Sequence, residues 1–267
     1  MKDVRITHVG GPTVLIETGG WRLLTDPTFD PPGRTYEFGP AISSRKLAGP
    51  AVPAADLGPI DAVLLSHDHH QDNLDDAGRA LLSGAGAVLT TRAGAERLGP
   101  WATGLEPWDV ARLGTPGRPA LDVTATPCRH GPPLSRPVVG DVVGFGLRWE
   151  GQEHGALWIT GDTVLYDAVR EVPRRLPIDT ILLHLGGVRF PATGPLRYTM
   201  TGSEAVELCR LARPRTVVPI HYEGWAHFAE GRDAAEREFA AAPDVARVVR
   251  WAPLGAPMDL AAASDGG

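Results

Sequence analysis

The sequence predicts a mixed α/β fold in which two β-sheets pack face to face and helices cover their outer faces. Short strand-like runs open the chain, strands and helices then alternate, and the second half repeats this order. The 267 residues, 43% of them hydrophobic, can bury one sizeable core. We therefore expect a single domain over residues 1–267 with two related halves, about 1–120 and 121–267.

The first half opens with a predicted meander of hairpins. Residues 3–9, 13–18 and 21–25 are β-branched or aromatic runs separated by Gly-Gly pairs and a proline. A loop rich in proline and glycine follows at residues 27–59.

A βα step comes after that loop. The apolar run at residues 60–66 predicts a strand, and Leu74, Ala77 and Leu81 then recur at helical spacing. A further strand is expected at residues 87–91.

The second half predicts further strands with helices between several of them. The expected strands lie near residues 121–126, 142–149, 155–160, 178–184, 215–220 and 246–251. One helix start is well marked, because Thr201 and Glu204 form a capping box before apolar residues at helical spacing.

The segment Asp61–Asp75, DAVLLSHDHHQDNLD, carries the strongest functional signal. Its apolar strand leads directly into three histidines and two aspartates, in the order His67, Asp68, His69, His70 and Asp72. Imidazole nitrogens and carboxylate oxygens are ligands of divalent ions such as zinc. The alternative is an ordinary polar loop in which Asp72 or Asn73 caps the following helix.

Three later strands also end at residues of ligand type. LDVTAT is followed by His130, ALWIT by Asp162, and TVVPI by His221 and Tyr222. Taken singly, each is more typical of a hydrogen-bonded strand end or a turn. We expect His227 to lie on a helix after His221, held down by Trp225 and Phe228.

Together, this order of ligand-type residues resembles that of the metallo-β-lactamase superfamily. The resemblance covers nearly the whole chain and implies a four-layer αββα sandwich that gathers such loops along one edge. Within the superfamily, the chain looks most like the group of ascorbate-phosphate lactonases and N-acylphosphatidylethanolamine-hydrolysing phospholipases. The stretch Val218–Phe228, VPIHYEGWAHF, is the most specific match.

The chain departs from the superfamily signature His-x-His-x-Asp-His. Read forward, His67 and His69 fall on the first two ligand positions, but Gln71 then stands where Asp belongs. Read backward, Asp72 and His70 fit, and Asn73 stands where the last histidine belongs. One extra loop residue reconciles the readings, so we assign His67, His70 and Asp72 as ligands, with His69 as the substitute for either histidine.

The resemblance implies the remaining site residues. His130, Asp162 and His221 would complete two adjacent metal sites, and Asp72 and Asp162 would be the catalytic carboxylates. Asp26 looks like the buried aspartate that orients a ligand histidine. Asn73, His184 and Tyr222 would surround the site or contact substrate. Because an amide is a poorer ligand than imidazole, we expect one tight metal and an uncertain second one. Zinc is expected, with manganese or iron as alternatives.

The predicted function is a metal-dependent hydrolase that uses a metal-bound hydroxide on a small ester, lactone or phosphoester. The alternative is a non-catalytic or redox, iron-binding member of the same fold. A net charge of −6 argues against a nucleic-acid partner, and no apolar run is long enough for a membrane span. Two widely spaced cysteines and no signal segment favour the cytoplasm, and the sequence leaves the oligomeric state open.

Overall fold

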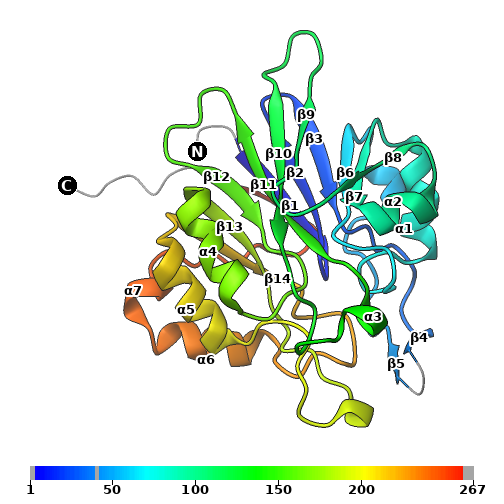
Figure 1. Ribbon diagram of the computed structural model, residues 1–267, viewed down its shortest axis with the longest axis vertical. Helices are drawn as coiled ribbons and strands as arrows, with labels where there is room; N and C mark the ends of the chain where they lie inside the picture. Colours follow the sequence, from blue (N-terminus) through cyan, green and yellow to red (C-terminus); the bar gives the residue numbers. More distant parts are fainter. Residues whose placement is uncertain (1–3, 40–41, 261–267) are drawn as a thin grey trace.

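Two large β-sheets face each other in the computed structural model, which describes residues 4–39 and 42–260 (Figure 1). The first sheet has the strand order β15-β1-β2-β3-β6-β7-β8, and the second has the order β14-β13-β12-β11-β10-β9. The strands of the first sheet are β1 (Val4–Gly10), β2 (Thr13–Thr18), β3 (Trp21–Thr25), β6 (Ala62–Leu64), β7 (Val88–Thr91), β8 (Ala102–Leu105) and β15 (Pro257–Asp259). The strands of the second sheet are β9 (Val110–Leu113), β10 (Leu121–Pro127), β11 (Val143–Trp149), β12 (Ala156–Ile159), β13 (Ile178–His184) and β14 (Thr216–Ile220).

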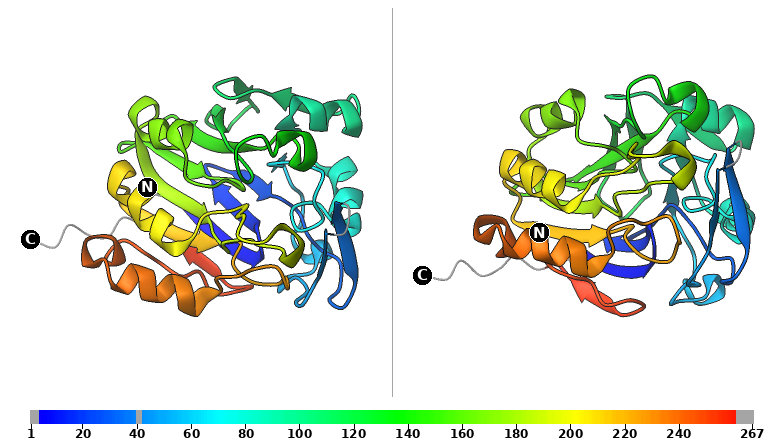
Figure 2. Two further views of the ribbon diagram at one scale, coloured as in Figure 1. Left: turned by 60° about the horizontal axis from the view of Figure 1, so that its bottom comes forward. Right: turned by 90° about the horizontal axis from the view of Figure 1, so that it is seen from below.

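Helices cover the outer faces of both sheets. Helices α1 and α2 lie beside the first sheet, and α4 to α7 lie beside the second; Figure 2 shows α5 (yellow) and α6 (orange) side by side. The helices are α1 (Asp76–Leu81), α2 (Arg92–Leu98), α3 (Arg136–Val139), α4 (Asp167–Arg175), α5 (Gly202–Ala212), α6 (Arg232–Ala240) and α7 (Pro243–Ala246), with 3-10 turns at Ala54–Asp56, Leu82–Gly84 and Pro191–Thr193. The sandwich predicted from the sequence is confirmed.

The main core lies between the two sheets. Ile6, Ile16 and Leu64 of the first sheet pack in one cluster with Phe145 and Leu182 of the second. All five side chains are almost fully buried, and burying such a side chain contributes roughly 1.5–3 kcal/mol. This shared core fixes the two sheets relative to each other, and with them the loops at the sheet edges.

Strand direction brings the functional loops to common edges. In the first sheet β3, β6 and β7 are parallel, and in the second β12, β13 and β14 are parallel. Because β10 and β12 are both antiparallel to β11, β10 runs in the same direction as β12. The carboxyl ends of β10, β12, β13 and β14 therefore lie at one edge of their sheet.

Several features differ from the sequence prediction, among them the strands β8, β9 and β15, which the sequence did not predict. The strand expected at residues 246–251 is wrong: Pro243 starts helix α7, and Val249 then makes only an isolated bridge to Val217. The loop at 27–59 holds a hairpin that the sequence did not predict, formed by β4 (Thr35–Gly39) and β5 (Ile42–Arg45). The first residue of the strand predicted at 3–9 lies outside the described residues.

The predicted capping box at the start of α5 is confirmed. The Thr201 hydroxyl accepts the Glu204 N–H, and the Glu204 carboxylate accepts the Thr201 N–H at 3.1 Å. Thr201→Ala should lower the free energy of unfolding by about 1 kcal/mol, as loss of a cap does elsewhere. Urea denaturation measures this, with Thr115→Ala at an exposed turn as the matched control. Equal effects of the two substitutions would contradict the capping role.

Among the helices that the structure describes, none combines the length and the apolar character needed to cross a bilayer.

Candidate metal centre

Loops from both sheets bring histidines and aspartates together. The loop after β6 carries His67, His70 and Asp72, and His130, Asp162 and His221 follow β10, β12 and β14. These six residues form two groups, in each of which one ligand atom per residue lies within 4.8 Å of the others. All six are buried.

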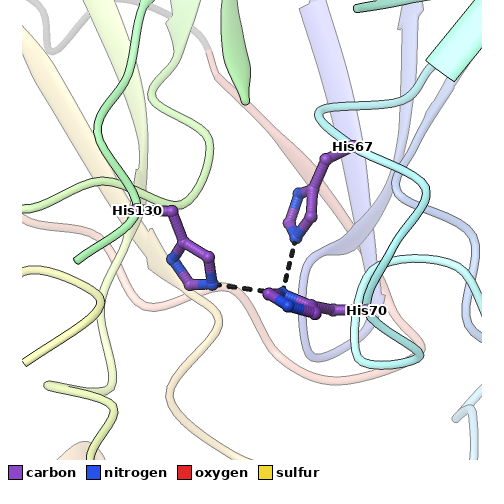
Figure 3. Close-up of side chains that lie close together, drawn as sticks. All are labelled: His67, His70 and His130. Carbon is purple, nitrogen blue, oxygen red and sulfur yellow. Dashed lines mark hydrogen bonds between the residues drawn. The ribbon is translucent and has the colours of Figure 1, made fainter. Parts of the chain in front are cut away.

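The first group consists of His67, His70 and His130. His70 Nδ1 lies 3.1 Å from His67 Nε2 and 3.2 Å from His130 Nε2 (Figure 3). A tetrahedral ion with metal–nitrogen bonds of about 2.0–2.1 Å separates its ligands by about 3.3–3.4 Å. The three ring nitrogens are therefore already spaced as ligands of one ion.

Neighbouring groups orient two of these imidazoles. His130 Nδ1 donates to the Tyr198 carbonyl at 2.8 Å, which leaves Nε2 unprotonated toward the group. His67 Nδ1 lies 2.9 Å from Ser66 Oγ. Burial lowers the pKa of His67 well below its usual value, that of His70 to about 4 and that of His130 to about 3. The imidazoles are thus neutral at pH 7, the form that binds metal.

The second group consists of Asp72, Asp162 and His221. His221 Nε2 lies 3.6 Å from Asp72 Oδ2, and its Nδ1 lies 3.3 Å from Asp162 Oδ1. Within residues 4–39 and 42–260, no hydrogen bond of normal geometry reaches Asp72 Oδ1 or either carboxylate oxygen of Asp162. His221 has a left-handed backbone (φ 56°), an uncommon conformation for a residue other than glycine.

The charges of the second group call for a cation. Burial, together with repulsion from Asp72 and Asp26, raises the pKa of Asp162 to about 7. Burial alone would lower the pKa of His221, but the charges of Asp162 and Asp72 raise it to about 9. Two buried carboxylates are costly unless a positive charge is beside them. This donor set, with its unsatisfied oxygens, fits a divalent metal.

Asp75 accounts for the start of helix α1 and leaves Asp72 free for the second group. Its carboxylate accepts the Gly78 N–H at 2.9 Å as the N-cap. The alternative in which Asp72 or Asn73 caps the helix is therefore wrong. Asp75 also pairs with Lys46 Nζ at 2.7 Å, and both side chains are buried.

The ring centroid of His69 lies 6.4 Å from that of His67 and 6.3 Å from that of His70, so His69 is a neighbour of the first group without being part of it. Its ring lies 3.7 Å from Asp68 and packs against Gly140, where an added Cβ would meet the ring at 2.2 Å. His69 belongs to neither group. Tyr222, which we expected beside the metal site or the substrate, instead packs in the core between the second sheet and its helices, edge-on to Trp251.

Asp26, His184 and Asn73 line the second group. Asp26 Oδ1 accepts the Ser66 N–H at 2.6 Å, and its Oδ2 lies 3.5 Å from His184 Nε2. The ring of His184 lies 5.6 Å from that of His221. Asp26 thus contacts His184 and the backbone beside His67, rather than the ring of His67 itself.

His227 is the site residue that sequence reasoning missed. It lies in the loop between β14 and α6, not on the helix that we expected after His221. Its Nε2 lies 3.1 Å from Asp72 Oδ2. No spacing rule finds it, because it follows no strand directly.

Two hollows adjoin the centre. A small one is lined by apolar side chains above the ligands, namely Phe38, Ile42, Val139, Val188, Phe190 and Tyr198, with His70, Asp72 and His130 at its base. A larger cavity of about 520 Å³ shares His130 and Val139 with it and carries Arg92, Arg129 and Arg136.

Comparisons with known proteins identify the family to which the chain is related. Residues 21–222 match the model of the family described as Beta-lactamase superfamily domain. The chain is 29% identical to a metal-dependent hydrolase of Opitutus terrae, over 82% of this chain and 85% of the relative.

Two solved structures have a similar fold. One is a possible metal-dependent hydrolase from Veillonella parvula, with a TM-score of 0.80, 18% identity and 97% and 100% of the two chains covered. The other is an isothiocyanate hydrolase from Delia radicum gut bacteria, with a TM-score of 0.78, 18% identity and 96% and 98% covered. At this level of identity, the likeness concerns the fold.

Proposed function

The chain belongs to the family described as Beta-lactamase superfamily domain, and we propose that it is a metal-dependent hydrolase. Its centre is built from the two ligand groups, namely His67, His70, His130, Asp72, Asp162 and His221. The observation that carries the proposal is the pair of adjacent buried ligand groups, with ring nitrogens 3.1 and 3.2 Å apart in the first. The curated relative named above is itself called a metal-dependent hydrolase.

Some residues of the centre would hold the metal, and others would orient a water molecule and accept its proton. The three imidazoles of the first group are neutral, and the Tyr198 carbonyl fixes the tautomer of His130. Asp72 and Asp162 have carboxylate oxygens free to hold a water molecule and accept its proton. When bound, a divalent ion supplies Lewis acidity, which lowers the pKa of a coordinated water to about 7 and stabilises charge on a carbonyl or phosphoryl oxygen.

The surroundings favour a substrate with both an apolar and an anionic part. The small hollow beside His70, Asp72 and His130 has a volume of about 20 Å³, and the rest of its lining is apolar, which favours an apolar part of the substrate at this side of the centre. In the larger cavity, Arg92 pairs with Glu106 at 3.1 Å and Arg136 pairs with Asp141. Arg129 instead stacks on Tyr166, and its buried Nε has no hydrogen-bond partner among the described residues.

Arg129 is thus placed to bind an anion such as a phosphodiester. A phosphoester is therefore the substrate class that we favour, ahead of a neutral ester or lactone.

Metal analysis coupled to a substrate panel tests the proposal. Purified protein is assayed with chromogenic phosphodiesters, lactones and thioesters and with an isothiocyanate, before and after chelation and with zinc or manganese returned. We expect hydrolysis of at least one class, its loss on chelation and its recovery on reloading.

Zinc is the metal that we propose for the native centre, with manganese and iron as alternatives. Protein purified without metal, with no uptake and no hydrolysis after loading, would contradict the proposal. Tightly bound iron with oxygen reactivity and no hydrolysis would favour the redox alternative.

A further inference from the structure

The loop after β6 has no histidine where the superfamily signature ends. Asn73 occupies that position, and its Nδ2 donates to Ser66 Oγ at 3.3 Å. Asn73 is fully buried, and its Oδ1 makes no hydrogen bond of normal geometry with the residues that the structure describes. Since Nδ2 is engaged by Ser66, Asn73 can offer only its amide oxygen to the second group, and amide oxygen is a weaker ligand than imidazole.

His227 places an imidazole beside the same group from a different loop. The residue is only 5% exposed, and its Nε2 lies 3.1 Å from Asp72 Oδ2. This separation equals that between His67 and His70 in the first group. In the part of the chain that the structure describes, neither ring nitrogen of His227 makes a hydrogen bond of normal geometry. A buried imidazole with unsatisfied nitrogens is costly.

Aromatic side chains fix the orientation of this ring. Trp225 stacks on it with centroids 5.8 Å apart, and Phe38 and Phe228 contact it edge-on at 5.2 and 4.8 Å. Phe190 closes a further side at 5.3 Å. These apolar neighbours offer no acceptor to the imidazole, so the polar partner available to it is the cluster around Asp72.

We propose that His227 supplies the imidazole that Asn73 cannot, so that Asp72, Asp162, His221 and His227 together bind a second divalent cation. The inference rests on the proposed function, because it requires a metal centre. The two carboxylates of this set neutralise a divalent charge, whereas the first group offers three neutral imidazoles. The two sites therefore differ in charge, and the second should favour ions that accept oxygen ligands.

A cobalt(II) titration of the metal-free full-length protein tests this assignment. Equilibrium dialysis and visible absorption should show two equivalents bound by the wild type. His227→Ala should bind one equivalent, or the second at least about 100-fold more weakly, since loss of a mere outer partner costs about 10–100-fold. His69→Ala is the matched control and should keep two equivalents, because His69 lies in neither group. Thermal unfolding of the metal-free variants checks that each is folded.

Nuclear magnetic resonance distinguishes a ligand from a residue that only positions Asp72. In cadmium-loaded protein labelled at histidine nitrogens, a His227 ring nitrogen should show direct coupling to the metal nucleus. Absence of that coupling, with coupling present for His221, would overturn the assignment. Two unaltered equivalents in His227→Ala, or a single equivalent in the wild type, would also overturn it and leave the proposed function intact. If the wild-type protein binds no cobalt, the proposed function itself would be contradicted.

Discussion

Replacing Asp162 with alanine is expected to abolish turnover and to weaken metal binding together. Asp162 is fully buried, lies 3.3 Å from His221 Nδ1 and belongs to the second ligand group. Loss of an outer hydrogen-bond partner of a metal ligand costs about 10–100-fold in affinity or activity. Because Asp162 is both a ligand and a candidate base, its replacement should lower kcat/KM by more than about 100-fold.

Two measurements separate this effect from a general loss of structure. Metal content by plasma emission and kcat/KM on the substrate found by the panel should fall together in Asp162→Ala. Asp122→Ala, in the second sheet but outside both groups, should change neither quantity. Full activity of Asp162→Ala at wild-type metal content would show that Asp162 is not part of the site.

Of the substitutions proposed for unfolding measurements, Lys46→Met should cause the largest decrease in the free energy of unfolding. Lys46 Nζ lies 2.7 Å from Asp75 Oδ2, and the two side chains are 3% and 0% exposed. Breaking a buried ion pair at one partner costs about 3–5 kcal/mol, because the other charge remains buried. The loss should lie near the lower end of that range, since Asp75 also accepts the N–H groups of Phe29, Asp30 and Gly78.

An exposed ion pair of the same length provides the control. Arg5 Nε lies 2.7 Å from Asp259 Oδ1, with side chains 53% and 64% exposed. Arg5→Met should leave the free energy of unfolding nearly unchanged, because water and salt screen such pairs. Urea denaturation of both variants gives the comparison. Equal destabilisation by the two substitutions would show that burial does not govern the strength of the Lys46 pair.

The sequence predicted the sandwich because its signals were local. Buried strands such as Ala156–Ile159 are continuous apolar runs, and Thr201 with Glu204 marks a helix start without reference to the rest of the fold. The hairpin of β4 and β5 escaped prediction because its strands are only five and four residues long, and the polar–apolar alternation of β4 does not continue into β5. The strand expected at 246–251 failed because its valines pack beside a single bridge rather than in a ladder.

Prediction of the site had a similar limit. Residues that directly follow strands, such as His130 and Asp162, could be identified because strand ends share an edge. The choice among His67, His69 and His70 could not be made from spacing alone, because it depends on where one extra loop residue bulges. His227 could not be found at all, because its position depends on how the aromatic residues of a long loop pack around it.

The two ligand groups draw on different lengths of the chain, which has a consequence for biosynthesis. The three histidines of the first group are all present once residue 130 has been made, whereas the second group needs His221. The strand that completes the first sheet, β15, comes later still. A nascent chain leaving the ribosome would therefore carry the three histidines and Asp72 well before Asp162 and His221 exist. The complete pair of ligand groups can therefore form only when translation is almost finished.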